Sequence, residues 1–382
     1  MGISSGKISI IGSRGIPAKY GGFEVFSEQL AMRLAERGHD VSVCCEFSNH
    51  NDLDSYKGVT LHYFPIPPPK KYSLRKFYEI LNDIYFISIM SASTDFLYIL
   101  GVGTAGWFTF FPKLVNRNVK VIINIDGLEW KRDKFNIFEK LVLRINNLLA
   151  IFFADTVIID SKNLIKYIAK DKKSKTIFIP YGVEIPESVL WNNSELEKIS
   201  LNCNGICMVK PNRYWLVVAR LEPENNIHTI LKGYLQSSSK IPLIVVGDPT
   251  NKHYKIKLKK ILETDDNKKI MMVGSIYDLQ LLNMLRQNCF AYIHGHSVGG
   301  TNPSLLEAMI MKSIIVAHDN EFNREVCQDS ALYFKDELEL KEEVESIENF
   351  REDYTKLKNL AYVRACKEYP WDKIVDIYES VF

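Results

Sequence analysis

The chain lacks any long apolar segment. None of its 382 residues lies in an uninterrupted apolar run of the roughly 18 residues that a membrane-spanning helix requires. The first residues lead directly into a strand-like segment, without the basic start and apolar core of a secretory signal. The composition, with 46% hydrophobic and 25% charged residues, is typical of a soluble globular protein. We therefore expect the protein to be cytoplasmic.

Cysteine is also scarce, and no set of side chains has clear metal-ligand spacing. Several of the seven cysteines lie in apolar strand-like runs, as reduced core residues do. Cys203 and Cys207 are four residues apart, but no second pair follows them. His294 and His296 have no cysteine or carboxylate nearby, and the D-L-D at 52–54 follows a loop rather than a buried strand. We expect no disulfide framework, no metal and no cofactor.

The net charge is only +2, but it is unevenly distributed. Residues 1–185 contain 24 Lys and Arg against 18 Asp and Glu, whereas 186–382 contain 24 against 28. A basic first half favours an anionic partner such as a membrane surface, although ordinary scatter of solvated lysines remains an alternative. The proline run and basic, aromatic segment at 66–81 could rest on a membrane or form a solvated linker. We expect no nucleic-acid partner.

What is present is a repeated alternation of apolar strands and amphipathic helices. Continuous apolar strands separated by helices predict an α/β fold with parallel sheets covered on both faces. The pattern breaks at P-Y-G-V-E-I-P-E (180–187) and then restarts. We therefore predict an N-terminal Rossmann-like domain at 1–185 and a C-terminal Rossmann-like domain at 186–365. The amphipathic end, 366–382, is predicted to cross back to the first domain. The expected strands are 7–12, 40–45, 95–100, 119–125, 156–160, 176–180, 214–220, 241–247, 269–274, 290–294 and 313–318.

The loop between the first strand and the first helix is rich in glycine and carries two cations. In a doubly wound sheet this position is the carboxyl edge, where ligands bind. The loop does not match G-x-G-x-x-G, so an NAD-dependent dehydrogenase is disfavoured. A glycine-rich turn without a ligand is the alternative reading. The residues predicted to face the acceptor or the reaction centre are Arg14, Gly15, Lys19, Tyr20, Gly21 and Gly22.

Two carboxylates follow the strand at 119–125. Asp126 comes directly after it and Glu129 three residues later, with Gly127 between them. A carboxylate at a strand end beside a cleft can act as a base or stabilise a developing oxocarbenium ion. We therefore predict Asp126 and Glu129 as catalytic residues. The alternative is that Asp126 only caps the following helix.

The segment H-G-H-S-V-G-G-T-N-P-S-L-L-E-A-M (294–309) predicts an anion site. An apolar strand leads through a glycine-bearing loop into a helix, for which Asn302 suits the N-cap and Pro303 the first position. Such a helix start presents backbone N–H groups and the positive end of the helix dipole to an anion. Glu307 lies one turn further, where it can accept hydrogen bonds from sugar hydroxyls. The pattern indicates a nucleotide-sugar site.

Other strand ends are predicted to complete this site. Arg220 ends a strand, and its guanidinium can bind a diphosphate, although a surface ion pair with Glu222 or Glu224 is the alternative. Further strand ends on the same edge could frame the nucleoside. The full set of predicted donor-binding residues is Arg220, Gly247, Gly274, Ser275, Gly299, Gly300, Thr301, Asn302, Ser304 and Glu307.

Taken together, these motifs resemble the family-4 retaining glycosyltransferases over nearly the whole chain. The resemblance rests on R-L-E-P-E after a strand, on the later L-L-E-A-M helix and on Y-G-V-E at 181–184. It implies the GT-B fold, two Rossmann-like domains whose parallel sheets face each other across a cleft, with 1–185 as the acceptor domain and 186–365 as the nucleotide-sugar donor domain. It also implies retention of configuration, donor-diphosphate binding by Arg220 and by N–H groups from Gly299 to Ser304, and ribose binding by Glu307.

Three segments resemble more narrowly a bacterial rhamnosyltransferase branch that assembles capsule and cell-wall polysaccharides. They are the loop at 12–24, D-G-L-E-W-K-R at 126–132 and G-G-T-N-P-S-L-L-E-A-M at 299–309. Two departures affect the donor site. Many members carry a glutamate eight residues before the second one, where this chain has Gly299, and a lysine where it has Asn225. A site with fewer polar anchors suits a deoxysugar such as rhamnose.

We therefore expect a metal-independent hexosyltransferase, with dTDP-L-rhamnose as the first choice of donor. The nucleotide-sugar is a substrate, and the expected acceptor is a lipid-linked saccharide at the inner face of the membrane. The alternatives are a transferase for another UDP- or GDP-sugar, an epimerase or phosphorylase of the same fold, and a non-catalytic nucleotide-sugar-binding partner.

Overall fold

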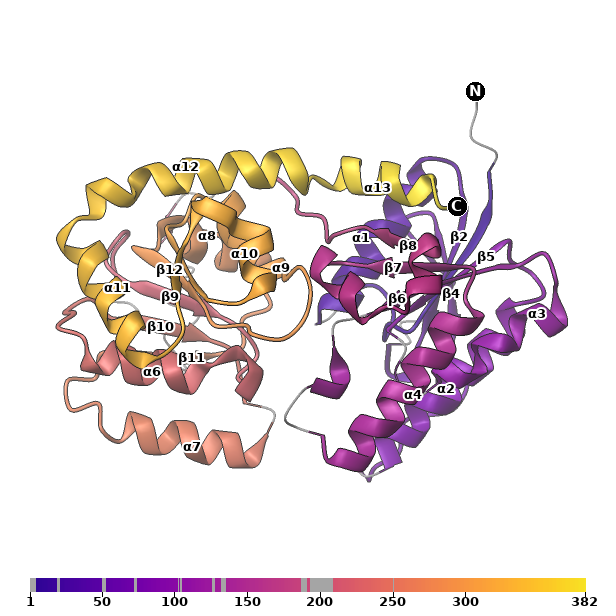
Figure 1. Cartoon of the computed structure of the whole chain (residues 1–382), viewed down its shortest axis with the longest axis horizontal. Coiled ribbons are helices and arrows are strands. Elements are labelled where there is room, and N and C mark those ends of the chain that lie inside the picture. Colours follow the sequence, from indigo (N-terminus) through magenta and orange to yellow (C-terminus); the bar gives the residue numbers. More distant parts are fainter. Residues whose placement is uncertain are drawn as a thin grey trace. The chain divides into compact units, whose positions relative to one another are not determined.

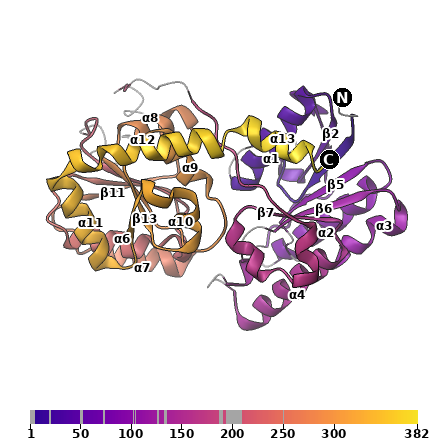
Figure 2. The same cartoon turned by 45° about the horizontal axis from the view of Figure 1, so that its top comes forward.

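The chain forms two compact units. The computed structural model describes residues 5–18, 21–49, 53–71, 74–101, 103, 105–125, 128–131, 135–186, 191–192, 209–249 and 251–382. Unit 1 comprises residues 1–182 together with 371–382, and unit 2 comprises 183–370. Figures 1 and 2 show the elements of both units. Each unit is a parallel sheet flanked by helices, which confirms the predicted α/β class.

Unit 1 is built on an eight-stranded sheet with the order β3-β4-β2-β1-β5-β6-β7-β8. All neighbouring pairs are parallel except β3 with β4. The central strands are mostly apolar and buried, as the sequence predicts, with Ser9 and Asn124 as buried polar exceptions. The edge pair β3 and β4 was not predicted, because V-T-L-H-Y mixes polar and apolar residues. The strands are β1 (Lys7–Ile11), β2 (Asp40–Cys45), β3 (Ser55–Tyr56), β4 (Val59–Tyr63), β5 (Phe96–Leu100), β6 (Lys120–Ile125), β7 (Thr156–Ile159) and β8 (Thr176–Phe178).

The helices of unit 1 connect these strands. Helix α1 begins at Gly22 directly after the glycine loop, and α4 begins with a capping box in which Asn136 and Glu139 bind each other's backbone N–H. A run of short 3-10 turns, η5 (Lys162–Tyr167) and η6 (Lys170–Lys175), lies between β7 and β8. The helices are α1 (Gly22–Glu36), α2 (Arg75–Met90), α3 (Pro112–Val115), α4 (Ile137–Phe153) and α13 (Trp371–Glu379).

The C-terminal helix α13 belongs to unit 1 (Figure 1). Its buried Tyr378 shares a hydrogen bond with the hydroxyl of Tyr98 on β5, at 2.9 Å. Arg37, just after α1, pairs with Asp376 at 2.6 Å and also with Glu379. Aromatic packing and ion pairs therefore both join the end of the chain to its first helix and strands.

Unit 2 is built on a six-stranded sheet with the order β11-β10-β9-β12-β13-β14, and all its neighbouring strands are parallel. Strands β9 to β13 lie where the sequence predicts them. The short edge strand β14 was not predicted. The strands are β9 (Trp215–Val218), β10 (Leu243–Val246), β11 (Ile270–Gly274), β12 (Ala291–His294), β13 (Ile315–His318) and β14 (Leu332–Phe334).

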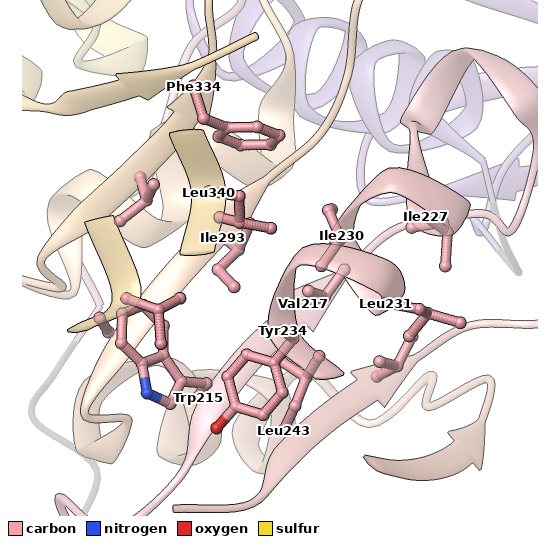
Figure 3. Close-up of a cluster of buried hydrophobic side chains, with 14 of the residues drawn as sticks. Trp215, Val217, Ile227, Ile230, Leu231, Tyr234, Leu243, Ile293, Phe334 and Leu340 are labelled. Carbon is pink, nitrogen blue, oxygen red and sulfur yellow. The ribbon is translucent and has the colours of Figure 1, made fainter. Parts of the chain in front are cut away.

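The core of unit 2 lies between its sheet and the helices on one face. Figure 3 shows Trp215 and Val217 of β9 turned toward the buried side chains of α6, among them Tyr234. Gly233 lets α6 approach α11, because a Cβ there would lie 2.6 Å from the Glu337 carbonyl oxygen. The helices are α6 (Ile227–Gln236), α7 (Lys252–Leu262), α8 (Leu279–Asn288), α9 (Pro303–Ile310), α10 (Glu321–Cys327), α11 (Glu337–Asn349) and α12 (Arg351–Glu368).

The described cysteines are unpaired, and Cys44, Cys45, Cys289 and Cys327 are buried. This agrees with the predicted reduced core residues. Cys203 and Cys207 lie outside the described residues. Within the part of the chain that the structure describes, no helix is both long and apolar enough to span a bilayer.

Candidate functional site

The carboxyl ends of the parallel strands of unit 2 share one edge of its sheet. Arg220 follows β9, Gly247 follows β10, Ser275 follows β11, and the loop from Gly295 to Asn302 follows β12. This edge is where open α/β sheets bind ligands. The topology thus brings the predicted donor-binding residues of unit 2 to a single edge.

The start of α9 has the geometry that the sequence predicts. The Asn302 side chain accepts a hydrogen bond from the Ser304 N–H at 3.0 Å, and Pro303 occupies the first turn. Gly299 adopts a φ of 130°, a conformation that L side chains rarely adopt. The loop therefore delivers the positive end of the α9 dipole to the sheet edge, where an anion is favoured.

Glu307 is held by a partner that the sequence analysis missed. Arg286 on α8 forms an ion pair with the Glu307 carboxylate. The Arg286 side chain is 2% exposed, whereas that of Glu307 is 29% exposed. One side of the carboxylate thus faces a buried guanidinium while part of it remains accessible to solvent. Arg286 lies 21 positions earlier on a different helix, so only the fold brings the two charges together.

Asn225 joins two loops of the site. Its amide N–H donates to the Arg220 carbonyl at 2.7 Å, and its Oδ1 lies 2.7 Å from Nδ1 of His296. Ser297 completes the connection, because its N–H donates to the Glu224 carbonyl at 2.9 Å. Asn225 therefore supports the geometry of the loops after β9 and β12, a role that its position in the motif did not reveal.

The Arg220 side chain is exposed. Its assignment to a donor diphosphate stays a prediction, beside the alternative of an ion pair with Glu222 or Glu224. Both of those glutamates are themselves buried. The position and exposure of Arg220 are compatible with contact to an anion at this edge.

Gly247 and Gly274 have a packing role at the ends of β10 and β11. The Gly247 N–H donates to the Gly274 carbonyl at 2.8 Å. A Cβ on Gly247 would lie 1.9 Å from the Ala219 carbonyl oxygen, which no side chain could occupy. The Ser275 N–H is taken by the Asp248 carboxylate at 2.9 Å. Whether these residues also frame a nucleoside stays a prediction.

The two histidines of the motif, His294 and His296, are held by contacts within unit 2. His294 is buried at the end of β12, and burial, with smaller contributions from His296 and His318, holds its pKa well below the usual value. It is therefore neutral at physiological pH. His296 is bound to Asn225. Among the described residues no group of three or more His, Cys, Asp or Glu side chains is arranged to hold a metal ion.

The glycine loop of unit 1 is also explained in part by packing. A Cβ on Gly12 would lie 2.1 Å from the Leu100 carbonyl oxygen, and one on Gly15 would lie within 3 Å of Cys45. The Arg14 N–H donates to Glu24 at 3.3 Å, and burial raises the pKa of the Glu24 carboxyl. Glu24, on α1, is a second residue that the sequence analysis missed. Gly21 and Gly22 end the loop, and Lys19 and Tyr20 lie outside the described residues.

The two predicted catalytic residues follow β6. Asp126 lies outside the described residues. Glu129 begins the 3-10 turn η4 (Glu129–Lys131), and its side chain is likewise not described. The last polar residue of the strand, Asn124, is buried and donates to the Tyr98 hydroxyl at 3.3 Å. The catalytic assignments therefore remain predictions.

Comparison with known proteins separates the two units in the same way. Residues 6–184 match the family model described as "Domain of unknown function (DUF1972)", and residues 209–364 match "Glycosyl transferases group 1". Unit 2 carries a glycosyl transferases group 1 domain. No curated protein sequence matches the chain.

Three of the solved structures that are similar to the chain align with it over almost the full length of both chains. Sucrose-phosphate synthase from Thermosynechococcus elongatus has a TM-score of 0.79 at 16% identity, with 99% of each chain covered. HepE from Anabaena, in complex with UDP-glucose, has a TM-score of 0.75 at 15% identity, covering 98% of this chain and 99% of its own. The catalytic domain of starch synthase IV from Arabidopsis thaliana has a TM-score of 0.72 at 13% identity, with 99% of each chain covered. At these identities the likeness shows the fold, which is GT-B.

The elements around the predicted donor site follow partly from local sequence signals and partly from the order of the strands. Local capping signals predicted the start of α9, and strand order brought Arg220 and the β12 loop to one edge. The glycosyltransferase domain also contains Arg286, which no local pattern singled out, and Asn225, which the motif comparison marked only as a departure from the family's lysine. Arg286 lies on the buried face of α8 together with Leu281, Asn283, Met284 and Leu285, so a charged residue at a buried helical position is the signal that could have found it.

Proposed function

We propose that the protein is a glycosyltransferase that moves a hexose from a nucleotide-sugar donor to an acceptor hydroxyl. The observation that carries this proposal is the capped start of α9, with Glu307 one turn inside it, at the carboxyl edge of a glycosyl transferases group 1 domain. HepE, which shares the fold, has been crystallised with UDP-glucose, and this supports a nucleotide-sugar as the donor.

In this proposal the donor side of the reaction is carried by unit 2. Arg220 and the N-terminus of α9 bind the diphosphate and stabilise the negative charge that develops as it leaves, without a metal. Glu307 accepts hydrogen bonds from the ribose hydroxyls, and Arg286 keeps its carboxylate in place. The residues from Gly299 to Ser304 supply backbone contacts to the phosphates, and Gly247, Gly274 and Ser275 border the nucleoside.

The acceptor side is assigned to unit 1. The loop from Arg14 to Gly22 faces the acceptor, and Asp126 and Glu129 orient it or stabilise positive charge on the sugar. The acceptor hydroxyl attacks on the face from which the diphosphate leaves, and the departing phosphate takes its proton, so configuration is retained. The proposed donor is dTDP-L-rhamnose. The proposed acceptor is a lipid-linked saccharide of capsule or cell-wall polysaccharide synthesis, at the inner face of the membrane.

Nucleotide binding tests the donor site directly. We expect thermal stabilisation of the purified protein by dTDP and dTDP-rhamnose, and weaker stabilisation of the Arg220→Ala variant by the same ligands. Lys210→Ala, which removes an exposed cation outside the strand ends, is the matched control. Stabilisation by UDP- or GDP-sugars alone would exclude the rhamnose assignment, and unchanged affinity of Arg220→Ala would contradict the proposed diphosphate site.

Transfer of labelled sugar to a lipid-linked saccharide tests the reaction. Product with the same anomeric configuration as the donor is expected. Release of a free-sugar epimer instead would identify an epimerase, and nucleotide binding without turnover on any lipid-linked acceptor would favour a non-catalytic binding partner.

A further inference from the structure

Helix α4 of unit 1 has an apolar surface that nothing in the described structure covers. Its exposed apolar residues follow one another at intervals of four, four, three and four residues, with one further neighbour at the start. These spacings place them on one face of a helix. The outermost are Ile137 and Phe138, which are 88% and 73% exposed. The whole stripe consists of Ile137, Phe138, Leu141, Ile145, Leu148 and Phe152.

The opposite face of α4 is the one that packs into unit 1. Leu143, Ala150 and Ile151 are buried there, so the fold already uses a separate set of side chains to hold the helix. A helix at a protein surface normally turns charged and polar residues to solvent. On α4 the only charged side chain among the exposed helical positions is Arg144. The stripe is therefore not explained by the packing of the unit.

Lysines border one end of the stripe. The segment from Lys162 to Lys175 contains six lysines and one acidic residue, Asp171. Its contact with the helix is direct, because the Lys172 Nζ lies 4.7 Å from the centre of the Phe152 ring. The Lys175 ammonium donates to the Phe152 carbonyl at 3.3 Å and to that of Ala154. The basic segment is thereby fixed beside the last turn of the apolar face.

The other end of the stripe lies next to the start of α2. Lys76 of α2 pairs with Glu139 of α4 at 2.5 Å, and its Nζ lies 5.1 Å from the centre of the Phe135 ring. The neighbouring Leu74, the N-cap of α2, and Phe77 on α2 are exposed as well. Cations and exposed apolar side chains therefore occur together along α4 and at both of its ends.

We propose that this α4 face, the stripe with its lysine-rich border, docks on the surface of an anionic lipid bilayer. Helix α4 would lie in the plane of the interface, with the stripe among the acyl chains and the lysines at the phosphates. The stripe spans about 22 Å at 1.5 Å per residue, enough to lie along a bilayer but too short to cross one. A neutral protein partner would not need the lysine border, so charge complementarity selects the lipid surface. The inference rests on the proposed function in that a lipid-linked acceptor gives the docking a purpose.

Vesicle binding by the full-length protein tests the proposal without any donor or turnover. The probes are vesicles of phosphatidylcholine alone and of phosphatidylcholine with about a third phosphatidylglycerol. We expect binding to the anionic vesicles that weakens with salt, and at least a tenfold loss of partitioning for Leu141→Gln with Leu148→Gln. The matched control is Leu360→Gln with Val363→Gln on α12, which changes side chains of similar exposure in unit 2. It should bind like the wild type.

The electrostatic part has its own pair of variants. Lys170→Gln, Lys172→Gln and Lys173→Gln together should reduce binding to anionic vesicles several-fold and flatten its salt dependence. The same change at Lys255, Lys259 and Lys260 of α7 alters net charge equally and should have little effect. Equal losses of vesicle binding in both triple variants would show that only the net charge of the protein matters. That result would overturn the role given to the lysine-rich border.

Two further results would overturn the proposal. One is binding to anionic vesicles that is unchanged in the α4 double variant. The other combines two observations: the protein does not bind vesicles, and sedimentation velocity shows a dimer for the wild type but a monomer for the α4 double variant. The stripe would then be an interface between two copies of the chain. Nucleotide stabilisation, measured on the same variants, should remain at the wild-type level. If nucleotides fail to stabilise even the wild-type protein, the proposed function is contradicted, whereas the vesicle-binding result still stands.

Discussion

The ion pair between Arg286 and Glu307 allows a quantitative prediction about the donor site. Glu307→Ala removes the carboxylate and leaves the buried Arg286 guanidinium without its partner. Breaking a fully buried pair in this way costs about 3–5 kcal/mol. Since the Glu307 side chain is 29% exposed, water can reach the vacated space, and we expect roughly 2–3 kcal/mol. For a unit of this size the midpoint of thermal unfolding should fall by about 4–12 °C.

Glu307→Gln serves as the comparison. Its amide oxygen can still accept from Arg286, so we expect a loss of only about 1 kcal/mol. Arg286→Met should relieve most of the cost of Glu307→Ala when the two changes are combined, because the unpaired charge is removed. Calorimetry gives the midpoint of the unit 2 unfolding transition for the wild type, Glu307→Ala, Glu307→Gln and the combined Arg286→Met and Glu307→Ala variant. Equal midpoints for Glu307→Ala and Glu307→Gln would refute the reasoning.

This prediction bears on how Glu307 should be tested as a ribose ligand. A lower nucleotide-sugar affinity of Glu307→Ala would have two causes that the experiment cannot separate, the loss of a sugar contact and the displacement of α8 and α9. Glu307→Gln preserves the internal hydrogen bond while removing the negative charge. It is therefore the variant whose nucleotide affinity reports on the ligand contact itself, and we expect that affinity to fall.

Three further expectations concern the scaffold. Burial raises the pKa of Asp83 on α2 from 3.8 to about 7. The folded carboxyl then keeps its proton between about pH 4 and pH 7 whereas the unfolded one loses it, so stability should fall as pH rises through this window, by at most about 1.4 kcal/mol per pH unit. Urea unfolding of Asp83→Asn should lack that fall, and a profile identical to the wild type would contradict the assignment. Gly247→Ala places a Cβ 1.9 Å from the Ala219 carbonyl oxygen and should destabilise unit 2 by more than about 2 kcal/mol in the same assay, whereas an unchanged midpoint would show that the strand ends separate easily. Tyr378→Phe removes the hydrogen bond to Tyr98 and should cost about 1 kcal/mol in unit 1 without affecting unit 2; a loss in both transitions would contradict that expectation.

The sequence predicts the parts of this fold that depend on short stretches of chain. Continuous apolar strands alternate with helices, and Asn302 followed by Pro303 marks a helix start, because these signals come from a few adjacent residues. Strand β4 was missed because V-T-L-H-Y mixes polar and apolar residues, and the edge strand β14 because it is short and only partly buried. An edge strand has one neighbour and one exposed side, so its sequence carries a weaker apolar pattern.

The remaining features depend on contacts between distant segments. Arg286 meets Glu307 only after α8 and α9 pack together. The glycines of the loop after β1 looked like ligand-binding residues, yet Gly12 and Gly15 are already required by close approach to Leu100 and Cys45. The exposed stripe of α4 could not be distinguished in the sequence from a core face, because both are apolar.

The position of α13 in unit 1 has a consequence for how the protein is made. Unit 2 is an insertion between Gly182 and Trp371, so the aromatic cluster around Tyr98 gains its last members only when the end of the chain has been synthesised. Unit 2 is continuous in sequence and can fold on the ribosome while unit 1 is still incomplete. A chain that stops before Trp371 would leave Phe26 and Tyr98 without their α13 partners, a state in which aggregation competes with folding.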